Sequence, residues 1–335
     1  MKLGIKKENQ MQVFAPNESR DFGSKVAEYL DIPLAAHEER NFEDGEHKMR
    51  PLVSVRGEDV YVIQSLHGGP DTSCNDKLCR LLFFLGALRD NGARRITAVT
   101  PYFAYARKDR QTKARDPVTT KYMAQLLEAV GVDAVVTLEV HNIVAFQNSF
   151  RCRCIHLDTR ALFADRAAEL AGNAPVIVAS PDPGGVKRAQ LFRETLEKKI
   201  ARPVGSAFME KRRSHGKVTG TQFVGEVEGA IVLVMDDLIS TGGTMVRAAK
   251  AAREHGAQDV YALASHGLFV GKSASKMSDS SITGTIITDT VPPFRLGPAI
   301  AKANVEIISV APLFGEAIRR LHLNGSMVDL LAFPS

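Results

Sequence analysis

The stretch that decides the fold reads Ile231-Val232-Leu233-Val234-Met235-Asp236-Asp237-Leu238-Ile239-Ser240-Thr241-Gly242-Gly243-Thr244. Its first five residues are apolar and rich in β-branched side chains, which is typical of a strand buried in a parallel sheet. Two carboxylates follow at the end of that strand. A Ser/Thr/Gly turn then leads into a helix predicted over residues 245–255. We therefore expect a strand–turn–helix unit of an α/β fold.

The turn itself predicts a ligand. A strand-to-helix turn directs backbone N–H groups and the positive end of the helix dipole toward one point, which suits a phosphate monoester. Asp236 and Asp237 would repel a phosphate, so they suit the vicinal hydroxyls of a sugar or a metal ion instead. The motif indicates a sugar phosphate; the alternative is a structural turn whose acids are solvated.

The gross composition limits the class of protein. The chain has 335 residues, enough for two domains, and its 44% hydrophobic and 24% charged residues are typical of a soluble globular protein. No apolar run is long enough to cross a bilayer, and residues 1–7 lack the apolar core of a signal peptide. We expect a cytoplasmic protein with no membrane partner.

Charge and cysteine content exclude further classes. The net charge of +5 permits nucleic-acid binding, but the chain has no Trp and no basic repeat interleaved with aromatic residues. Much of the basicity lies in residues 107–115 and 211–217, and clusters of this size are more typical of small polyphosphate sites. We expect no nucleic-acid partner. Cys152 and Cys154 lack a second pair at zinc-site spacing, so free thiols are expected.

Strand-like runs alternate with amphipathic helices along the whole chain, which predicts an α/β fold with mainly parallel sheets flanked by helices. The predicted strands cover residues 59–64, 95–100, 134–138, 176–179, 231–235, 259–265 and 286–288. The predicted helices cover residues 120–130, 159–170, 186–199, 244–255 and 314–321. Because the second half repeats the plan of the first, we expect two domains, residues 8–156 and 157–312. A helix at about 313–325 is expected to pack back on the first domain.

Two further segments follow predicted strands and could hold a metal. Ser180-Pro181-Asp182-Pro183-Gly184-Gly185 combines a carboxylate with glycines that let backbone amides approach an anion closely. Asp182 could hold a metal directly or through water, or could be a structural turn residue. His141 follows the strand over residues 134–138, and it is either a structural hydrogen-bonding residue or a metal ligand.

Two basic segments are candidates for contact with phosphates. Tyr102, Phe103 and Tyr105 precede Arg107, Lys108 and Arg110, a combination that suits a stacked purine and its phosphates. Lys211 and Arg213 follow a strand-like run and could neutralise the charge on a transferred phosphoryl group. For both segments the alternative is a solvated surface. The chain has no Walker A sequence, so a P-loop mechanism is not expected.

Taken together, these motifs resemble the ribose-phosphate pyrophosphokinases, also called phosphoribosyl pyrophosphate (PRPP) synthetases. The similarity runs from about Phe42 to Leu321 and includes Phe42-Glu43-Asp44-Gly45-Glu46, Val62-Ile63-Gln64-Ser65, Asn75-Asp76, residues 101–110, residues 180–188, Lys211-Arg212-Arg213, the Ile231–Thr244 stretch, His266-Gly267-Leu268-Phe269 and Glu316-Ala317-Ile318-Arg319-Arg320. The chain departs from the family at Lys108, where Gln is common, and at Ser240, where an acidic residue is common.

The resemblance implies a fold and an activity. Members have two phosphoribosyltransferase-type domains related by duplication and form homo-oligomers built from dimers, usually hexamers. They transfer the diphosphoryl group of Mg-ATP to the 1-hydroxyl of ribose 5-phosphate, which gives PRPP and AMP. Two alternatives remain open: a non-catalytic, synthetase-associated regulatory subunit, and a phosphoribosyltransferase that consumes PRPP.

The resemblance also implies roles for individual residues. It places ATP against Phe42, Asp44, Glu46, Arg107, Lys108 and Arg110. It assigns Mg²⁺ to His141 and Asp182, and stabilisation of the transferred group to Lys211 and Arg213. It gives the ribose hydroxyls to Asp236 and Asp237, and the 5-phosphate to Ser240, Thr241, Gly242, Gly243 and Thr244.

Overall fold

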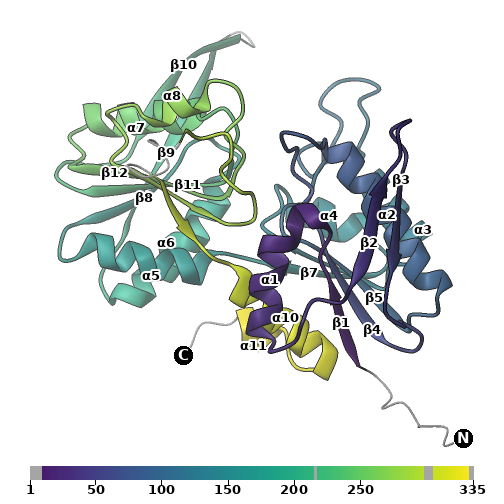
Figure 1. Cartoon of the computed structure of the whole chain (residues 1–335). Coiled ribbons are helices and arrows are strands. Elements are labelled where there is room, and N and C mark those ends of the chain that lie inside the picture. The colour runs from purple at the N-terminus through teal and green to yellow at the C-terminus, as the bar shows by residue number, and fades with distance from the viewer. Residues whose placement is uncertain (1–9, 215–216, 298–304, 332–335) are drawn as a thin grey trace, which may run out of the picture. The chain divides into compact units, whose positions relative to one another are not determined.

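The computed structural model describes residues 10–214, 217–297 and 305–331. The chain divides into two compact units, the first made of residues 1–157 and 310–335 and the second of residues 158–309. Each unit is built on a mainly parallel sheet with helices on its faces (Figure 1). The predicted α/β class is confirmed.

The first unit contains a five-stranded sheet in the order β1-β4-β5-β6-β7, and every neighbouring pair is parallel. The strands are β1 (Met11–Phe14), β4 (Asp59–Ile63), β5 (Arg95–Thr100), β6 (Ala134–Leu138) and β7 (Arg153–Leu157). All residues of β4 and β6 are buried, as expected for strands covered on both faces.

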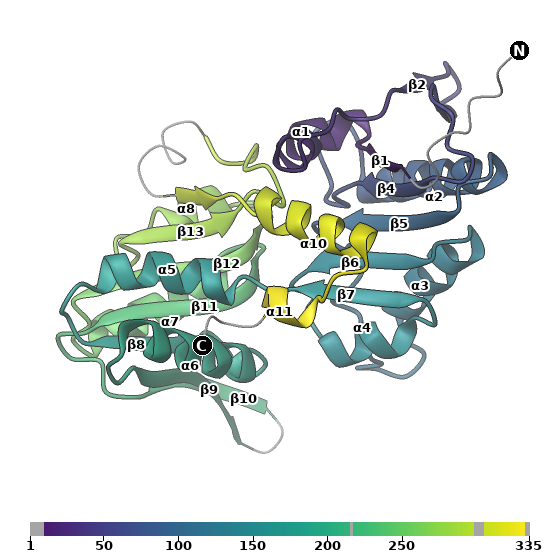
Figure 2. The same ribbon diagram turned by 90° about the horizontal axis from the view of Figure 1, so that it is seen from below.

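Helices cover both faces of this sheet. One apolar cluster joins the strands to α2 (Cys74–Asp90), α3 (Thr119–Ala129) and α4 (Ile143–Ser149). On the other face, α1 (Arg20–Tyr29) packs against α10 (Ala311–Leu323), and Figure 2 shows α10 lying across the strands. The short elements η1 (Asn17–Ser19) and α11 (Val328–Leu331) complete the unit with the hairpin β2 (His37–Asn41) and β3 (His47–Pro51).

A buried ionic network ties α10 to the sheet. Asp59 has no exposed side-chain surface and pairs with Arg95, whose guanidinium also donates to the carbonyl of Leu321 at 2.9 Å. The ring of His322 contacts the same carboxylate at 2.9 Å. Burial opposes ionisation of Asp59, but hydrogen bonds from Arg95, His322 and Tyr61 together lower the pKa of this carboxyl below its usual value. Loss of the Asp59 charge would therefore weaken the attachment of α10 to the sheet.

The second unit contains a seven-stranded sheet in the order β10-β9-β8-β11-β12-β13-β14, parallel throughout its described part except for the antiparallel β9–β10 pair. Its strands are β8 (Val176–Ser180), β9 (Gly205–Ser214), β10 (Lys217–Val224), β11 (Ile231–Ile239), β12 (Asp259–Gly267), β13 (Gly284–Thr288) and β14 (Val305–Ile308). Its helices are α5 (Arg160–Ala171), α6 (Val186–Ile200), α7 (Gly243–Glu254) and α8 (Ser273–Met277).

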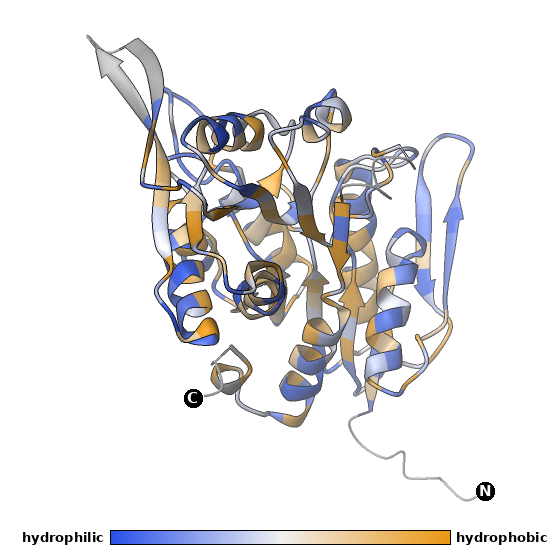
Figure 3. Cartoon of the chain, turned by 90° about the vertical axis from the view of Figure 1, so that its left-hand side faces the viewer, coloured by the Kyte–Doolittle hydropathy of each residue, from blue (hydrophilic) through white to orange (hydrophobic). Residues whose placement is uncertain are grey.

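The central strand β11 is buried on both faces by side chains that alternate. Ile231, Leu233 and Met235 pack with α5 and α6, whereas Val232 and Val234 pack with α7. This is the period of two that a strand imposes. Figure 3 shows the hydrophobic residues gathered on the strands and inner helix faces. No helix in the described ranges combines the length and apolar character needed to cross a membrane.

Most of the predicted elements are confirmed, but the end of the deciding strand is wrong. β11 continues to Ile239 instead of ending at residue 235, so Asp236 and Asp237 lie within the strand and not after it. Pairing with β12 extends the strand, since Leu238 and Ile239 stand opposite His266 and Gly267. Propensity alone disfavours Asp in strands, and the neighbouring ladder overrides it.

We predict that Asp59→Ala lowers the free energy of unfolding by roughly 3–5 kcal/mol, because it leaves the Arg95 guanidinium without its buried counter-ion. Urea unfolding at neutral pH measures the change. Glu169→Ala is the matched control: it breaks a more exposed pair with Arg166, worth about 1 kcal/mol or less. An Asp59→Ala protein as stable as this control would show that the network does not anchor the helix.

Candidate functional site

The turn between β11 and α7 exposes a run of free amides. The carbonyl of Ile239 accepts from Leu268 and Phe269, and that of Ser240 accepts from Val270 at 2.9 Å. Within the described part of the chain, the backbone N–H groups of residues 241–244 donate to no protein acceptor. They stand at the N-terminus of α7, where an anion is stabilised.

Gly242 is required by the geometry of this turn. Its φ of +74° lies in the left-handed region, which a residue with a Cβ adopts at a cost. A Cβ at this position would also lie 2.9 Å from Sδ of Met277 on α8. The second glycine of the motif begins the helix.

The acid pair lies one step before this turn. Asp237 is almost fully buried, while one fifth of the Asp236 side chain is exposed. The backbone N–H of Asp237 donates to Oδ1 of Asp236 at 2.9 Å. Nη1 of Arg188, on α6, stands 3.6 Å from Asp236 and 3.5 Å from Asp237. No role is predicted for Arg188 from the sequence, although a basic residue in the first turn of the helix after the Asp182 loop is a usable signal.

Burial, the charge of Asp237 and a hydrogen bond between the two carboxyl groups raise the pKa of Asp236 well above its usual value, and Arg188 offsets only part of this. Two neighbouring carboxyl groups favour a ligand that donates to both or neutralises them. A pair of adjacent hydroxyls, or a cation, meets that requirement.

Asp182 lies at the end of the strand next to β11. Its Oδ1 accepts from the backbone N–H groups of Gly184 at 2.8 Å and Gly185 at 3.2 Å, and Ser180 donates to its carbonyl at 2.6 Å. One carboxylate oxygen is thus committed to shaping the turn. Among the described residues, no hydrogen bond is made to the other oxygen, Oδ2.

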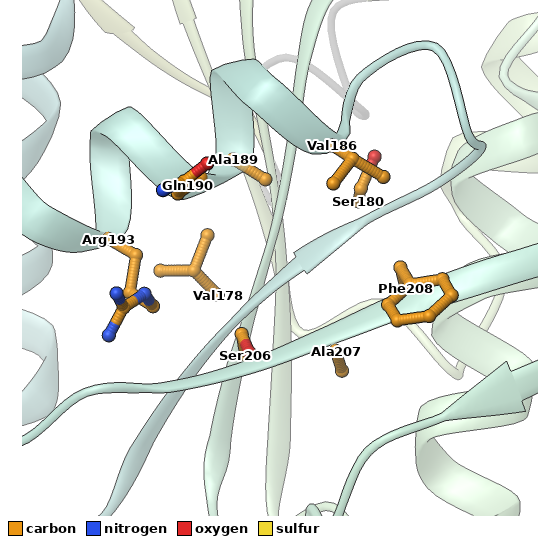
Figure 4. A pocket seen from close by; sticks show the side chains of 9 residues that line it. All are labelled: Val178, Ser180, Val186, Ala189, Gln190, Arg193, Ser206, Ala207 and Phe208. Atoms are coloured by element: carbon orange, nitrogen blue, oxygen red, sulfur yellow. The ribbon is translucent and has the colours of Figure 1, made fainter.

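A cavity of about 440 Å³ opens beside the Asp182 turn, between α6 and β9 (Figure 4). It is lined by Val178, Ser180, Val186, Ala189, Gln190, Arg193, Ser206, Ala207 and Phe208. None of the predicted site residues lines it. The candidate site at the carboxyl edge of the sheet is therefore not this cavity.

In the first unit, the basic loop after β5 is tied to itself. Nζ of Lys108 contacts the carboxylate of Asp116 and donates to Oγ1 of Thr112 at 2.9 Å. The backbone N–H groups of Thr112 and Lys113 donate to the same carboxylate. Hydrogen bonds from Lys108 and Thr112 hold the pKa of Asp116 well below its usual range. This loop therefore carries its own internal anion.

The same loop reaches the segment that carries His141. Nδ2 of Asn142 donates to Oδ2 of Asp109 at 2.6 Å, so the ends of β5 and β6 bring the two predicted groups together. Glu139, two residues before His141, has a φ of +40°. A non-glycine residue in this region is strained, and such strain often accompanies functional loops.

The hairpin that carries Phe42, Asp44 and Glu46 is separate. Residues 42–46 form the expected turn, in which Phe42 N donates to Glu46 O at 2.8 Å and Asp44 accepts from Glu46 N. Glu46 lines a cavity of about 400 Å³ with Gly45, His47, Asp76, Cys79, Arg80 and Phe83. Among the described residues, no hydrogen bond, ion pair or ring contact joins this turn to Arg107, Lys108 or Arg110.

Lys211 and Arg213 can be placed only by their backbone. Both belong to β9, opposite Thr221 and Val218 of β10. Their side chains lie outside the described part of the structure. Of the predicted residues, the second unit thus brings together Asp182, the acid pair and the 240–244 turn, and the first unit brings together the 107–110 loop and the His141 segment.

Comparison with known proteins identifies the family. Residues 11–131 match the model of the N-terminal domain of ribose phosphate pyrophosphokinase, and residues 214–332 match the phosphoribosyl synthetase-associated domain. A ribose-phosphate pyrophosphokinase of Hyphomonas neptunium is 37% identical over 93% of this chain and 96% of its own length. The chain belongs to the ribose-phosphate pyrophosphokinase family.

Two further proteins are similar to this chain over nearly its whole length. A ribose-phosphate pyrophosphokinase of Caldanaerobacter subterraneus is 38% identical over 96% of this chain and 98% of the relative. The crystal structure of phosphoribosylpyrophosphate synthetase from Mycobacterium smegmatis covers 94% of this chain with a TM-score of 0.85 at 31% identity. The pyrophosphokinase resemblance is confirmed for both halves of the chain.

We predict that Asp236→Asn stabilises the ligand-free protein at neutral pH. Because the folded state raises the pKa of Asp236, ionising this group costs the folded state more than the unfolded state. The penalty is absent below the unfolded pKa of about 4, grows as pH rises toward the folded pKa, and is complete above it. Removing it should stabilise the folded protein at pH 8.

Thermal unfolding across pH 4–8 tests this sign. The melting temperature of Asp236→Asn should exceed that of the unaltered chain at pH 8, and the difference should shrink toward pH 4. Asp165→Asn, which alters an exposed pair with Lys199, should differ little at either pH. A destabilised Asp236→Asn protein at pH 8 would contradict the raised pKa.

Proposed function

We propose that this chain is a ribose-phosphate diphosphokinase. The 1-hydroxyl oxygen of ribose 5-phosphate attacks the β-phosphorus of ATP, and the bond from that phosphorus to the oxygen bridging to the α-phosphate breaks. PRPP and AMP form, and the hydroxyl proton is released. The observation that carries the proposal is the free-amide turn of residues 241–244 directly beside the acid pair.

The second unit supplies the acceptor site in this proposal. The amides of residues 241–244, with the hydroxyl groups of Ser240, Thr241 and Thr244, bind the 5-phosphate. Asp236 and Asp237 accept from the ribose hydroxyls, and this fixes the sugar so that its 1-hydroxyl is presented for attack. Two donated hydrogen bonds also relieve the repulsion between the two carboxylates.

The first unit supplies the nucleotide site. Phe42, Asp44 and Glu46 contact ATP, and Arg107, Lys108 and Arg110 bind its phosphates. Lys108 is held by Asp116 in the free chain, so a polyphosphate would replace one carboxylate with a ligand of higher charge.

Lys211 and Arg213 stabilise the diphosphoryl group as it transfers.

Mg²⁺ is the proposed metal, with Asp182 and His141 as the residues that would hold it or its waters. The donor chemistry fits at Asp182, whose second carboxylate oxygen is not used by the turn. No cluster of three or more metal-binding side chains occurs in the described residues. Mg²⁺ usually keeps several waters and binds through one or two carboxylates together with substrate phosphates. When bound, it would neutralise phosphate charge.

We also propose the domain type, oligomeric state, location and partners that the sequence predicts. The two compact units correspond to two phosphoribosyltransferase-type domains, and the protein is a cytoplasmic homo-oligomer built from dimers. ATP and ribose 5-phosphate are its partners, and neither a nucleic acid nor a membrane is required.

Incubation with ATP, Mg²⁺ and ribose 5-phosphate tests the reaction. We expect equal amounts of AMP and PRPP, measured by chromatography, and a rate about a hundredfold lower for Lys211→Ala. Lys199→Ala, on α6 and paired with Asp165 at 2.7 Å, should keep the full rate. Activity that appears only after a second synthetase is added would support the regulatory-subunit alternative. Release of pyrophosphate from PRPP and a base, without ATP binding, would support the phosphoribosyltransferase.

Asp182→Asn tests the metal. Asparagine keeps Oδ1 as the acceptor for Gly184 and Gly185, so the turn should survive, but the charge that attracts a cation is lost. We expect the Mg²⁺ concentration for half-maximal rate to rise roughly tenfold. Asp289→Asn, on a carboxylate that accepts from Ser309 at 2.6 Å, is the control. An unchanged Mg²⁺ requirement would remove Asp182 from the metal site.

A further inference from the structure

Two cationic side chains lie beside the 241–244 turn. The position that a Cβ would occupy at Gly243 is 3.5 Å from Nζ of Lys276 and 3.9 Å from Nη1 of Arg247. Arg247 belongs to α7 itself, and Lys276 belongs to α8. Met277, the neighbour of Lys276, is fully buried against Gly242, so α8 is fixed against the turn.

Neither cation is neutralised by the protein. Both residues are exposed, and within the described ranges neither side chain forms an ion pair or a hydrogen bond. Two nearby basic groups are engaged: Lys250 pairs with Asp279 at 2.9 Å, and Arg253 binds the carbonyl of Ser281 and the hydroxyl of Thr283. Lys276 and Arg247 differ from these two.

Their location is electrostatically unfavourable in the free chain. The N-terminus of a helix carries positive partial charge and is usually matched by an acidic side chain in the first turn. The first turn of α7 has no acidic residue, and instead two full positive charges stand beside it. Such an arrangement becomes favourable only when an anion binds at the turn.

We propose that Lys276 and Arg247 bind the terminal phosphate of the sugar phosphate together with the amides of residues 241–244. This inference rests on the proposed function, and it adds two binding residues from outside the turn. A phosphate monoester carries close to two negative charges near neutral pH. Two exposed cations and four amides suit a dianion, and they give no advantage to an unphosphorylated sugar.

Calorimetric binding of ribose 5-phosphate and of inorganic phosphate, without ATP, tests the inference directly. We expect Lys276→Gln and Arg247→Gln each to weaken binding of both by roughly threefold to tenfold. Lys276→Arg, which keeps the charge, should restore most of it. In the assay of AMP formation, the KM for ribose 5-phosphate should rise by a similar factor, while kcat and the KM for ATP stay unchanged.

Lys272→Gln is the matched control, because Lys272 is an exposed lysine immediately before the same short helix. Melting temperatures equal to that of the unaltered chain would show that the variants are folded. The inference is overturned if Lys276→Gln and Arg247→Gln bind ribose 5-phosphate as tightly as Lys272→Gln, or if the unaltered chain binds neither ligand. Charge-dependent binding without AMP formation would overturn the proposed reaction and leave this inference standing.

Discussion

The second unit depends on one constraint, the burial of β11 between two helical layers. Its alternating side chains pack with α5 and α6 on one face and with α7 on the other. Backbone pairing with the neighbouring strand β12 extends β11 as far as Ile239. Two aspartates are thereby drawn into the edge of an apolar layer, where their charges cannot be fully solvated.

The remaining features of the site follow from that placement. Arg188 approaches the acid pair because α6 starts directly after the Asp182 turn. The carbonyl groups of Ile239 and Ser240 accept hydrogen bonds from the backbone N–H groups of residues 268–270. The amides that follow are left without acceptors. Packing of the sheet thus places a pair of carboxylates directly beside a run of backbone amides without protein acceptors.

Much of this arrangement could be predicted from the sequence, for physical reasons. The buried strands of both sheets are continuous apolar runs, and the loops after them carry glycines and carboxylates, which are typical of phosphate and metal sites. What the sequence could not supply was proximity across the fold. Lys276 is distant in the chain from Gly243. The hydrogen bond between Asn142 and Asp109 depends on β5 and β6 being neighbours in the sheet. The prediction that β11 ends at residue 235 is wrong because pairing with β12 sets where the strand ends.

The internal ion pair of the 108–116 loop has a consequence for selectivity. In the free chain, Asp116 already gives Lys108 a carboxylate, supported by Thr112 and the backbone of Lys113. Any incoming anion must therefore exchange with a tethered competitor whose effective concentration is high. A weakly charged ion such as chloride offers no gain in that exchange, whereas a polyphosphate offers several contacts at once. The 108–116 loop would therefore bind anions of high charge density, such as a polyphosphate, in preference to the singly charged anions of ordinary salt.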